Sequence, residues 1–355
     1  MFAGRVSPAR PPLAAAGLGK GAERTRPEPW RPIPGEGRRS DAGSEEQSKR
    51  RVSQAQEVRA MPPPVIVGVD GSAESLAAAE WAAREAVRRR RSLRLLHVWS
   101  WHPRQDGEPA TAAQRLAARR ALREAEERVG RACPQVRFEE EQVEGPATAA
   151  LLRAAAQADV LVLGSRGLSG FTGFLVGSVA LGVVARAARP VVLVPAGGTG
   201  ADGYETAGPQ GSGRRDVVLG LDLADPCDEV IEFAFEAARD RGSRLRAVHA
   251  WQSPVPFGFG PGEIGLIEAP WRADEWRDFL AAVLQTWRDK YPGVEVVETL
   301  TEGRPAAPLI HAASGASLLV VGRRIAQGPA LARTGPVAHA VIQHAGCPVA
   351  VVPHE

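Results

Sequence analysis

The sequence has few cysteines and few aromatic side chains, and it has no long apolar run. Its 355 residues include three cysteines, and aromatic residues make up 5% of the chain. Cys133, Cys227 and Cys347 are too widely spaced for a disulfide framework or a metal-ligand motif, so we expect a reducing, cytoplasmic location. No apolar run approaches the roughly 18 residues that span a bilayer, so no membrane partner is expected.

The excess of basic residues lies at the N-terminus. The formal net charge is +3, and residues 1–60 contain twelve Lys/Arg and seven Asp/Glu, which gives +5 for this segment and −2 for the rest. The remainder of the chain therefore gives no reason to expect a nucleic-acid partner. Arg88 to Arg91 form a basic run at the end of a predicted helix, where cations complement the helix dipole. We interpret this run as a solvated helix end rather than a nucleic-acid patch.

Composition and periodicity divide the chain into four segments. Residues 1–61 are rich in Arg, Pro, Gly, Ser and Glu without periodicity, which predicts a disordered N-terminal tail. Residues 62–196 alternate strand and helix patterns, and residues 214–355 do so again. Between them, residues 197–213 have the composition of a flexible linker. Five strand patterns, the third of them more polar, with four connecting helices in each half predict an α/β fold of two tandem, doubly wound, five-stranded parallel sheets.

The two halves carry the same short motifs at a nearly constant separation. Val67-Gly68-Val69-Asp70 corresponds to Leu219-Gly220-Leu221-Asp222, and His97-Val98-Trp99 corresponds to His249-Ala250-Trp251, both 152 residues later. Further on, the separation becomes 158 residues, as between Gly164 and Gly322. Such a repeat indicates the duplication of a complete domain.

A glycine-rich stretch in the first half has the pattern of an anion-binding loop. The apolar run 160–163 is followed by Gly164, Gly167 and, after nine further residues, Gly177-Ser178 and a helical pattern. Glycines let backbone N–H groups approach a phosphate, and a helix start adds unpaired N–H groups. Ser178 either caps that helix or donates its hydroxyl to a phosphate. The alternative is an ordinary strand-to-helix connection that uses glycines for turns.

A carboxylate is expected at the same edge of the sheet. Asp70 follows the first strand, and in a parallel sheet ligands lie beyond the carboxyl ends of the strands. A carboxylate there suits ribose hydroxyls or an adenine amino group and repels phosphate. The alternative for Asp70 is a helix N-cap or turn carboxylate. Arg166 in the loop is either a charge-assisted phosphate contact or an exposed loop arginine.

The spacing Gly-x2-Gly-x9-Gly-Ser after an apolar strand, together with Val-Asp-Gly-Ser after the first strand, resembles the universal stress protein family. The resemblance implies a Rossmann-like, adenine-nucleotide-binding fold with strand order 3-2-1-4-5, and ATP with Mg²⁺ as the ligand. It implies that adenosine contacts Gly68, Val69, Asp70 and Val98. It implies that the ribose and phosphates contact Leu163, Gly164, Arg166, Gly167, Gly177, Ser178 and Val179.

The resemblance also bears on assembly and on the second half. Members of this family pair through their fifth strands, which here are residues 191–194 and 349–352 of one chain, so the two domains are expected to pair intramolecularly, with a homodimer of two chains left open. In the second half Ile325 and Pro336 replace Gly167 and Ser178. Ile disfavours positive φ, and Pro removes a backbone N–H. We therefore predict a degenerate nucleotide motif there that binds ATP weakly or not at all.

The function predicted from the sequence is that of an ATP-binding universal stress protein with a regulatory stress-response role and no dedicated catalysis. The alternatives are a nucleotide-free interaction scaffold and a nucleotide hydrolase or AMP-forming enzyme on the same fold; weak ATP hydrolysis stays open. The chain contains neither a GxxxxGK[ST] motif nor a Ser-Gly-Gly-x-Asp-Ser loop. His97 and His249 occupy matched strand positions, and we interpret them as packing residues rather than catalytic bases.

Overall fold

The structure is a computed structural model that describes residues 62–99, 112–165, 176–195, 215–251, 273–325 and 333–355. All of these residues belong to one compact unit, residues 61–355. The predicted tail and linker, as well as Arg166 and Gly167, lie outside the described residues.

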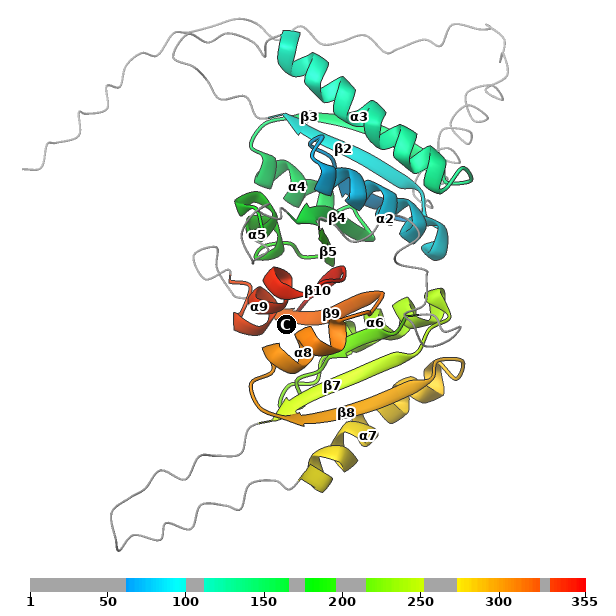
Figure 1. The fold of residues 1–355 in the computed structure, drawn as a ribbon, viewed down its shortest axis with the longest axis vertical. Coiled ribbons are helices and arrows are strands. Elements are labelled where there is room, and N and C mark those ends of the chain that lie inside the picture. Colours follow the sequence, from blue (N-terminus) through cyan, green and yellow to red (C-terminus); the bar gives the residue numbers. More distant parts are fainter. Residues whose placement is uncertain (1–61, 100–111, 166–175, 196–214, 252–272, 326–332) are drawn as a thin grey trace, which may run out of the picture. The chain divides into compact units, whose positions relative to one another are not determined.

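One sheet of ten strands runs through the unit (Figure 1). Its order is β3-β2-β1-β4-β5-β10-β9-β6-β7-β8, so each half has the predicted order 3-2-1-4-5. Strands are parallel within each half, and β5 and β10 pair antiparallel, with Ala350 opposite Val192. The strands are β1 (Val65–Gly68), β2 (Leu93–Trp99), β3 (Phe138–Glu144), β4 (Val160–Ser165), β5 (Val191–Pro195), β6 (Val217–Gly220), β7 (Leu245–Trp251), β8 (Val296–Glu302), β9 (Leu318–Arg324) and β10 (Val349–His354).

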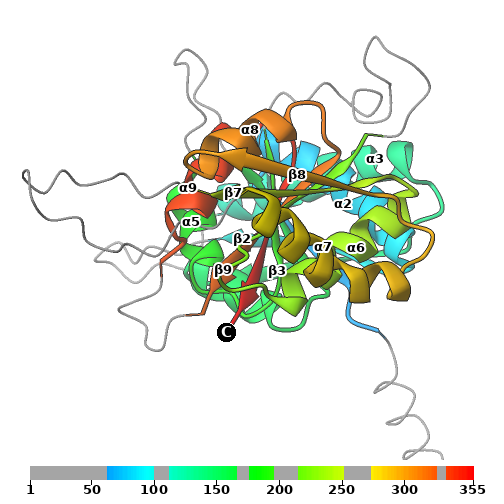
Figure 2. The ribbon, with the colours of Figure 1, turned by 90° about the horizontal axis from the view of Figure 1, so that it is seen from below.

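Helices cover both faces of the sheet (Figure 2). One core packs under α2, α3, α6 and α7, and the other packs under α4, α5, α8 and α9. The helices are α2 (Ala73–Arg89), α3 (Ala112–Ala132), α4 (Ala147–Ala155), α5 (Ser178–Val184), α6 (Asp228–Arg241), α7 (Ala273–Lys290), α8 (Ala306–Ala313) and α9 (Pro336–His344). None of the helices in the described segments is long and apolar enough to cross a membrane.

The central strands are continuous apolar runs because both of their faces are buried. In β1, Val65 and Val67 join one core and Ile66 joins the other. The strand β3 lies at an edge of the sheet and is acidic, with the sequence FEEEQVE. Charged side chains on an edge strand discourage pairing with another chain.

Contacts between the halves continue beyond the paired strands, through one buried arginine on β9. The Arg323 side chain is 5% exposed, and its guanidinium donates to the carbonyl oxygens of Ala185 and Ala187, just after α5. A cation there satisfies carbonyls left without helical partners. The second half thus stabilises the end of a helix in the first half.

A buried ion cluster joins α2 to α6. Glu85 on α2 is 1% exposed, and its carboxylate lies 2.7 Å from Nε of Arg89 and 2.6 Å from Nη2 of Arg241. Arg89 also lies 3.1 Å from Asp159. Burial would raise the pKa of Glu85, but the positive charges of Arg241, Arg89 and Arg88 outweigh it and lower the pKa to about 2.

This cluster corrects the interpretation of the arginine run 88–91 as a solvated helix end. The side chain of Arg89 is 8% exposed, because α6 of the second half packs against it. Arg88 and Arg91 are 25% and 32% exposed and reach toward carboxylates of Glu85 and Asp159. Arg90 ends α2 in a left-handed conformation, with φ 54°.

Acid should weaken the fold through Glu85. Its pKa in the folded protein, about 2, is below its usual 4.5, so the stability that the charged form provides is present above pH 4.5 and is lost as the pH falls toward 2. The loss from this group is on the order of 3 kcal/mol. Urea unfolding at several pH values would measure it, with Glu85→Gln as the matched control. The stability gap between the two proteins should narrow as the pH falls; a constant gap would contradict this assignment.

Candidate functional site

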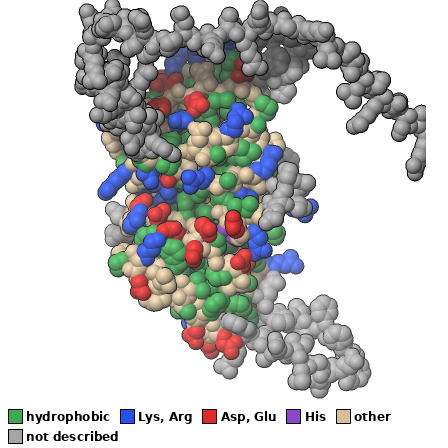
Figure 3. Space-filling model, turned by 180° about the vertical axis from the view of Figure 1, so that it is seen from behind, with side chains coloured by type: hydrophobic (Ala, Val, Ile, Leu, Met, Phe, Trp, Pro, Cys, Tyr) green, Lys and Arg blue, Asp and Glu red, His purple; other side chains and the backbone are tan. Residues whose placement is uncertain are grey.

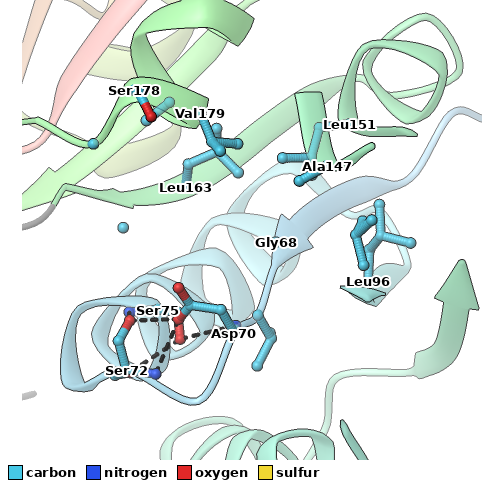
Figure 4. Close-up of a pocket in the computed structure, with 15 residues that line it drawn as sticks. Gly68, Asp70, Ser72, Ser75, Leu96, Ala147, Leu151, Leu163, Ser178 and Val179 are labelled. Atoms are coloured by element: carbon cyan, nitrogen blue, oxygen red, sulfur yellow. Dashed lines mark hydrogen bonds between the residues drawn. The ribbon is translucent and has the colours of Figure 1, made fainter. Parts of the chain in front are cut away.

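A cavity of about 480 Å³ opens where β1 and β4 end in the first half (Figure 4). Nine of the eleven residues predicted from the sequence line it. The other two, Arg166 and Gly167, lie outside the described residues. The nine are Gly68, Val69, Asp70, Val98, Leu163, Gly164, Gly177, Ser178 and Val179. β1 and β4 are adjacent and parallel, and the chain continues from them toward opposite edges of the half-sheet; such a switch point leaves a crevice at the carboxyl ends of the strands.

The cavity has an apolar wall that includes side chains not predicted from the sequence. Leu151 and Ala147 come from α4, and Leu96 comes from β2. Leu163 and Leu151 crowd Gly68, where an added Cβ would lie 2.7 Å from Leu163 Cδ2. Gly68 therefore keeps the space in front of β1 open. The spacing of the apolar residues at positions 147 and 151, one helical turn apart, is the sequence signal that could have indicated this wall of α4.

The polar rim of the cavity is centred on Asp70. Its Oδ1 accepts hydrogen bonds from the backbone N–H and the hydroxyl of Ser72, at 2.9 and 2.5 Å. The Ser72 hydroxyl in turn caps α2 by accepting from the N–H of Ser75, at 3.2 Å. Asp70 thus has the turn role that was its alternative interpretation, while its carboxylate remains exposed at the cavity rim (Figure 4). Ser72 and Ser75 also line the cavity and were not predicted.

The two strand histidines pack as the sequence predicted. His97 is 9% exposed, and its Nδ1 lies 2.7 Å from the carbonyl oxygen of Val69. His249 is 5% exposed and makes the matching contact to Leu221, at 3.0 Å. Each imidazole fixes the end of the first strand of its half against the second strand.

Gly164 has a structural role that the sequence did not indicate. A Cβ at this position would lie 2.6 Å from the carbonyl carbon of Glu74 and 2.8 Å from the backbone nitrogen of Ser75. The first turn of α2 therefore packs directly on the end of β4. Gly164 lines the cavity, but the absence of its side chain is required by helix packing and not only by access of a ligand.

The start of α5 excludes one of the two alternatives for Ser178, the helix cap. Gly177 is the N-cap of α5, with φ −62° and ψ 149°, and Ser178 is the first helical residue. Ser178 is therefore not the cap. The helix ends at Val184 and is only seven residues long. Ser178 and Val179 nevertheless line the cavity opposite Asp70 (Figure 4).

Comparison with known proteins gives a consistent family assignment. A sequence model of the universal stress protein family matches residues 61–195 and 213–353. The chain belongs to the universal stress protein family. A universal stress protein of Mycobacterium tuberculosis is 32% identical over 311 residues, covering 81% of this chain and 94% of the relative. One from Mycolicibacterium smegmatis is 31% identical over 298 residues, covering 81% and 96%.

The fold comparison agrees with the sequence comparison. The crystal structure of a universal stress protein from Archaeoglobus fulgidus superposes with a TM-score of 0.63 at 19% identity, covering 82% of this chain and 98% of that one. At this level of identity the likeness shows the fold alone.

The second half of this universal stress protein has a smaller cavity at the corresponding place. Its volume is about 270 Å³, and its lining includes Asp222, Asp225, Arg324 and His354. The Arg324 guanidinium pairs with the Asp225 carboxylate. A Cβ on Gly322 would lie 2.9 Å from the His354 ring. Charged and ring side chains therefore line this cavity beside the end of β9.

The start of α9 and its neighbours also differ from the first half. Pro336 is the first residue of α9, where the missing N–H breaks no helical hydrogen bond. Ile325, 42% exposed, follows β9, and its N–H donates to the backbone carbonyl oxygen of His354 at 2.6 Å.

Cys227 also lines the cavity of the second half. Burial and the hydrogen bond to Glu229 raise the pKa of the Cys227 thiol to about 11, so this cysteine stays protonated at neutral pH.

The described residues hold no metal-ligand cluster, and one face of the molecule carries charges of both signs. Its described residues hold no group of three or more His, Cys, Asp or Glu arranged for a metal ion. Basic and acidic side chains are interspersed on the face seen in Figure 3. Such mixing gives no extended patch for a polyanion.

Replacing Gly164 with Ala should destabilise the fold by about 1–3 kcal/mol, because the new methyl group would collide with the backbone of α2. Gly130 is the matched control: it lies in α3, and an added Cβ meets no atom within 4 Å. There alanine should be neutral or stabilise by up to about 1 kcal/mol. Equilibrium urea unfolding measures both, and equal stabilities of Gly164→Ala and Gly130→Ala would contradict the packing role.

Proposed function

We propose that this universal stress protein binds ATP, with Mg²⁺, in the cavity of its first half. We propose that binding serves a regulatory stress-response role in the cytoplasm and supports no dedicated catalysis. The observation that carries the proposal is that nine residues selected from the sequence through its family resemblance line one cavity. Its volume of about 480 Å³ is in the range of small-molecule sites, roughly 300–1,000 Å³.

The lining suggests how the parts of a nucleotide would lie. The wall of Leu96, Val98 and Leu151 suits the faces of a purine ring, since burial of apolar surface is favourable and undirected. Asp70 suits the ribose hydroxyls, which donate to a carboxylate. Its turn with Ser72 fixes the carboxylate before a ligand arrives, which reduces the ordering cost of binding.

The phosphates would extend toward Gly177 and Ser178, away from the charge of Asp70. The predicted loop residues Arg166 and Gly167 would complete the phosphate contacts. Mg²⁺ favours phosphate oxygens, water and one or two carboxylates over an all-protein cage. The ion would therefore be held mainly by the ATP phosphates.

The second half is proposed to bind ATP weakly or not at all. Its cavity is smaller, and the ion pair of Arg324 with Asp225 occupies its rim. A ligand would have to separate this pair or bind above it. The second half would then act mainly as a structural partner of the first.

A large side chain that fills the first cavity should weaken ATP binding, and one that fills the second cavity should not. Val98 and Ala250 are equivalent positions, and each lines the cavity of its own half. We expect Val98→Trp to lower the affinity for ATP by at least about tenfold, or about 1.4 kcal/mol, and Ala250→Trp to leave it unchanged. Isothermal titration calorimetry with ATP and MgCl₂ measures both, and circular dichroism checks that both variants fold.

The result also tests the alternatives. Equal loss in both variants, or loss in Ala250→Trp alone, would contradict the assignment to the first half. Failure of the wild-type protein to bind ATP would favour the nucleotide-free scaffold. For a binding protein, ATP at a hundredfold excess over Kd should add about 2.7 kcal/mol of stability.

Prolonged incubation with ATP and Mg²⁺ should yield no more ADP, AMP or inorganic phosphate than a buffer control. The reason is that Asp70, the one carboxylate lining the described part of the first cavity, is held in a turn by Ser72. Anion-exchange chromatography of the nucleotides measures the products. Turnover that exceeds the control and disappears in Val98→Trp would instead support the enzyme alternative.

A further inference from the structure

The contact between α2 and α6 is nearly symmetric. Residues of the two helices correspond at the 152-residue separation of the repeat, and both helices end in a left-handed residue at equivalent positions, Arg90 and Gly242. Arg89 and Arg241 are therefore equivalent, as are Trp81 and Phe233.

Each arginine stacks on the aromatic ring of the opposite helix. The Arg89 guanidinium lies 4.7 Å from the ring centre of Phe233, and the Arg241 guanidinium lies 5.8 Å from that of Trp81. The Arg89 and Arg241 side chains are only 8% and 6% exposed. Two buried cations thus lie at the centre of the contact, one from each half.

The symmetry fails at the acid that neutralises them. Glu85 contacts both arginines, at 2.7 Å from Arg89 and 2.6 Å from Arg241. Its equivalent on α6 is Ala237, which offers only a methyl group and a backbone carbonyl that accepts from Arg241. One carboxylate from one half therefore serves a cation from each half.

We propose that Glu85 makes this surface selective for the unlike half of the chain: a half that carries the central carboxylate fits a half that lacks it. The proposal goes beyond the proposed function and does not depend on nucleotide binding. It identifies the partner of the first half's surface as the second half, not a second copy of the same half.

The alternatives to unlike pairing are less favourable for two different reasons. Two second halves would bury two Arg241 side chains with Ala237 at both central positions, and an uncompensated buried charge is strongly destabilising. Two first halves would match two Arg89 side chains with two Glu85 carboxylates, but the second carboxylate would enter a space that an alanine methyl now fills, which adds overpacking and desolvation. One carboxylate is the number that the contact accommodates.

Neighbouring charges do not replace Glu85. Asp159 pairs with Arg89 and Arg91 but lies on the first half and has Ser317 as its equivalent. Glu236 on α6 interacts electrostatically with Arg89, yet burial raises its pKa. Arg88, 3.8 Å from Glu85 and 25% exposed, adds positive charge to the same side.

A double-mutant cycle at positions 85 and 237 in the full chain tests the proposal. Glu85→Ala removes the carboxylate, Ala237→Glu adds a second one, and the double substitution moves it to the opposite helix. Hydrogen exchange of the β5 and β10 amides reports on pairing of the halves. Glu80→Ala is the control, since Glu80 lies on α2 but pairs with Arg84 and Arg128, and Glu232 is its equivalent on α6.

We expect each single substitution at the centre to lower protection of β5 and β10, on the order of a hundredfold for Glu85→Ala. The double variant should recover protection to within about tenfold of wild type. Its loss of protection should therefore be smaller than the sum of the losses in the two single variants. Protection in the Glu80→Ala control should stay near wild type.

Additive losses in the double variant would overturn the proposal, as would wild-type protection in Glu85→Ala or an equal loss in Glu80→Ala. A double variant that folds when Glu85→Ala does not would support it. Failure of both to fold would overturn it, because moving the carboxylate would then not restore the contact.

Discussion

The antiparallel pairing of β5 with β10 is the interaction on which the architecture depends. A doubly wound sheet ends in an edge strand, and the sequence of β5, VVLVP, is entirely apolar. Exposed, such an edge would present unpaired backbone groups and apolar side chains to other chains. Pairing with β10 buries all five of its residues. The acidic β3 forms one of the two remaining edges of the sheet, where charge protects it instead.

Joining the two fifth strands also determines what meets on the face of the sheet. It brings α2 and α6, the first helices of their halves, into contact above the β5–β10 pair. Arg89 and Arg241 become buried there, with Glu85 between them. A second ionic contact between the halves comes from Arg323, whose guanidinium donates to a carbonyl oxygen at the end of α5. The ionic contacts between the halves therefore accompany the strand pairing and lie close to it.

Local sequence carries enough information to predict the strands and helices, while the strand order and most of the cavity residues came from the family resemblance. Apolar runs, helical spacing and the internal repeat specify the elements, and the rule that ligands lie beyond strand ends brings Asp70 and Gly164 together. The burial of Arg89 could not be predicted, because it depends on a helix 150 residues away whose placement follows from the strand pairing. The packing of α2 on Gly164 is likewise a tertiary contact. The sequence left open whether Ser178 caps the helix, because glycine and serine are both acceptable N-caps and the pattern Gly-Ser does not say which one begins the helix.

The two halves agree at the ends of their first strands and differ at the cavity rim and at the contact between α2 and α6. At the strand ends, both halves keep a small residue on β1 or β6 and a histidine that ties the first two strands together. At the cavity rim, a serine-capped turn in the first half stands against an ion pair of Arg324 with Asp225 in the second. At the joint, a glutamate stands against an alanine. A duplicated domain that pairs with itself must be compatible with its own surface, so a change such as Glu85 against Ala237 is tolerated only when the two copies are held in one chain. Covalent linkage therefore permits the asymmetry, and the half that supplies the central carboxylate is also the half with the larger cavity.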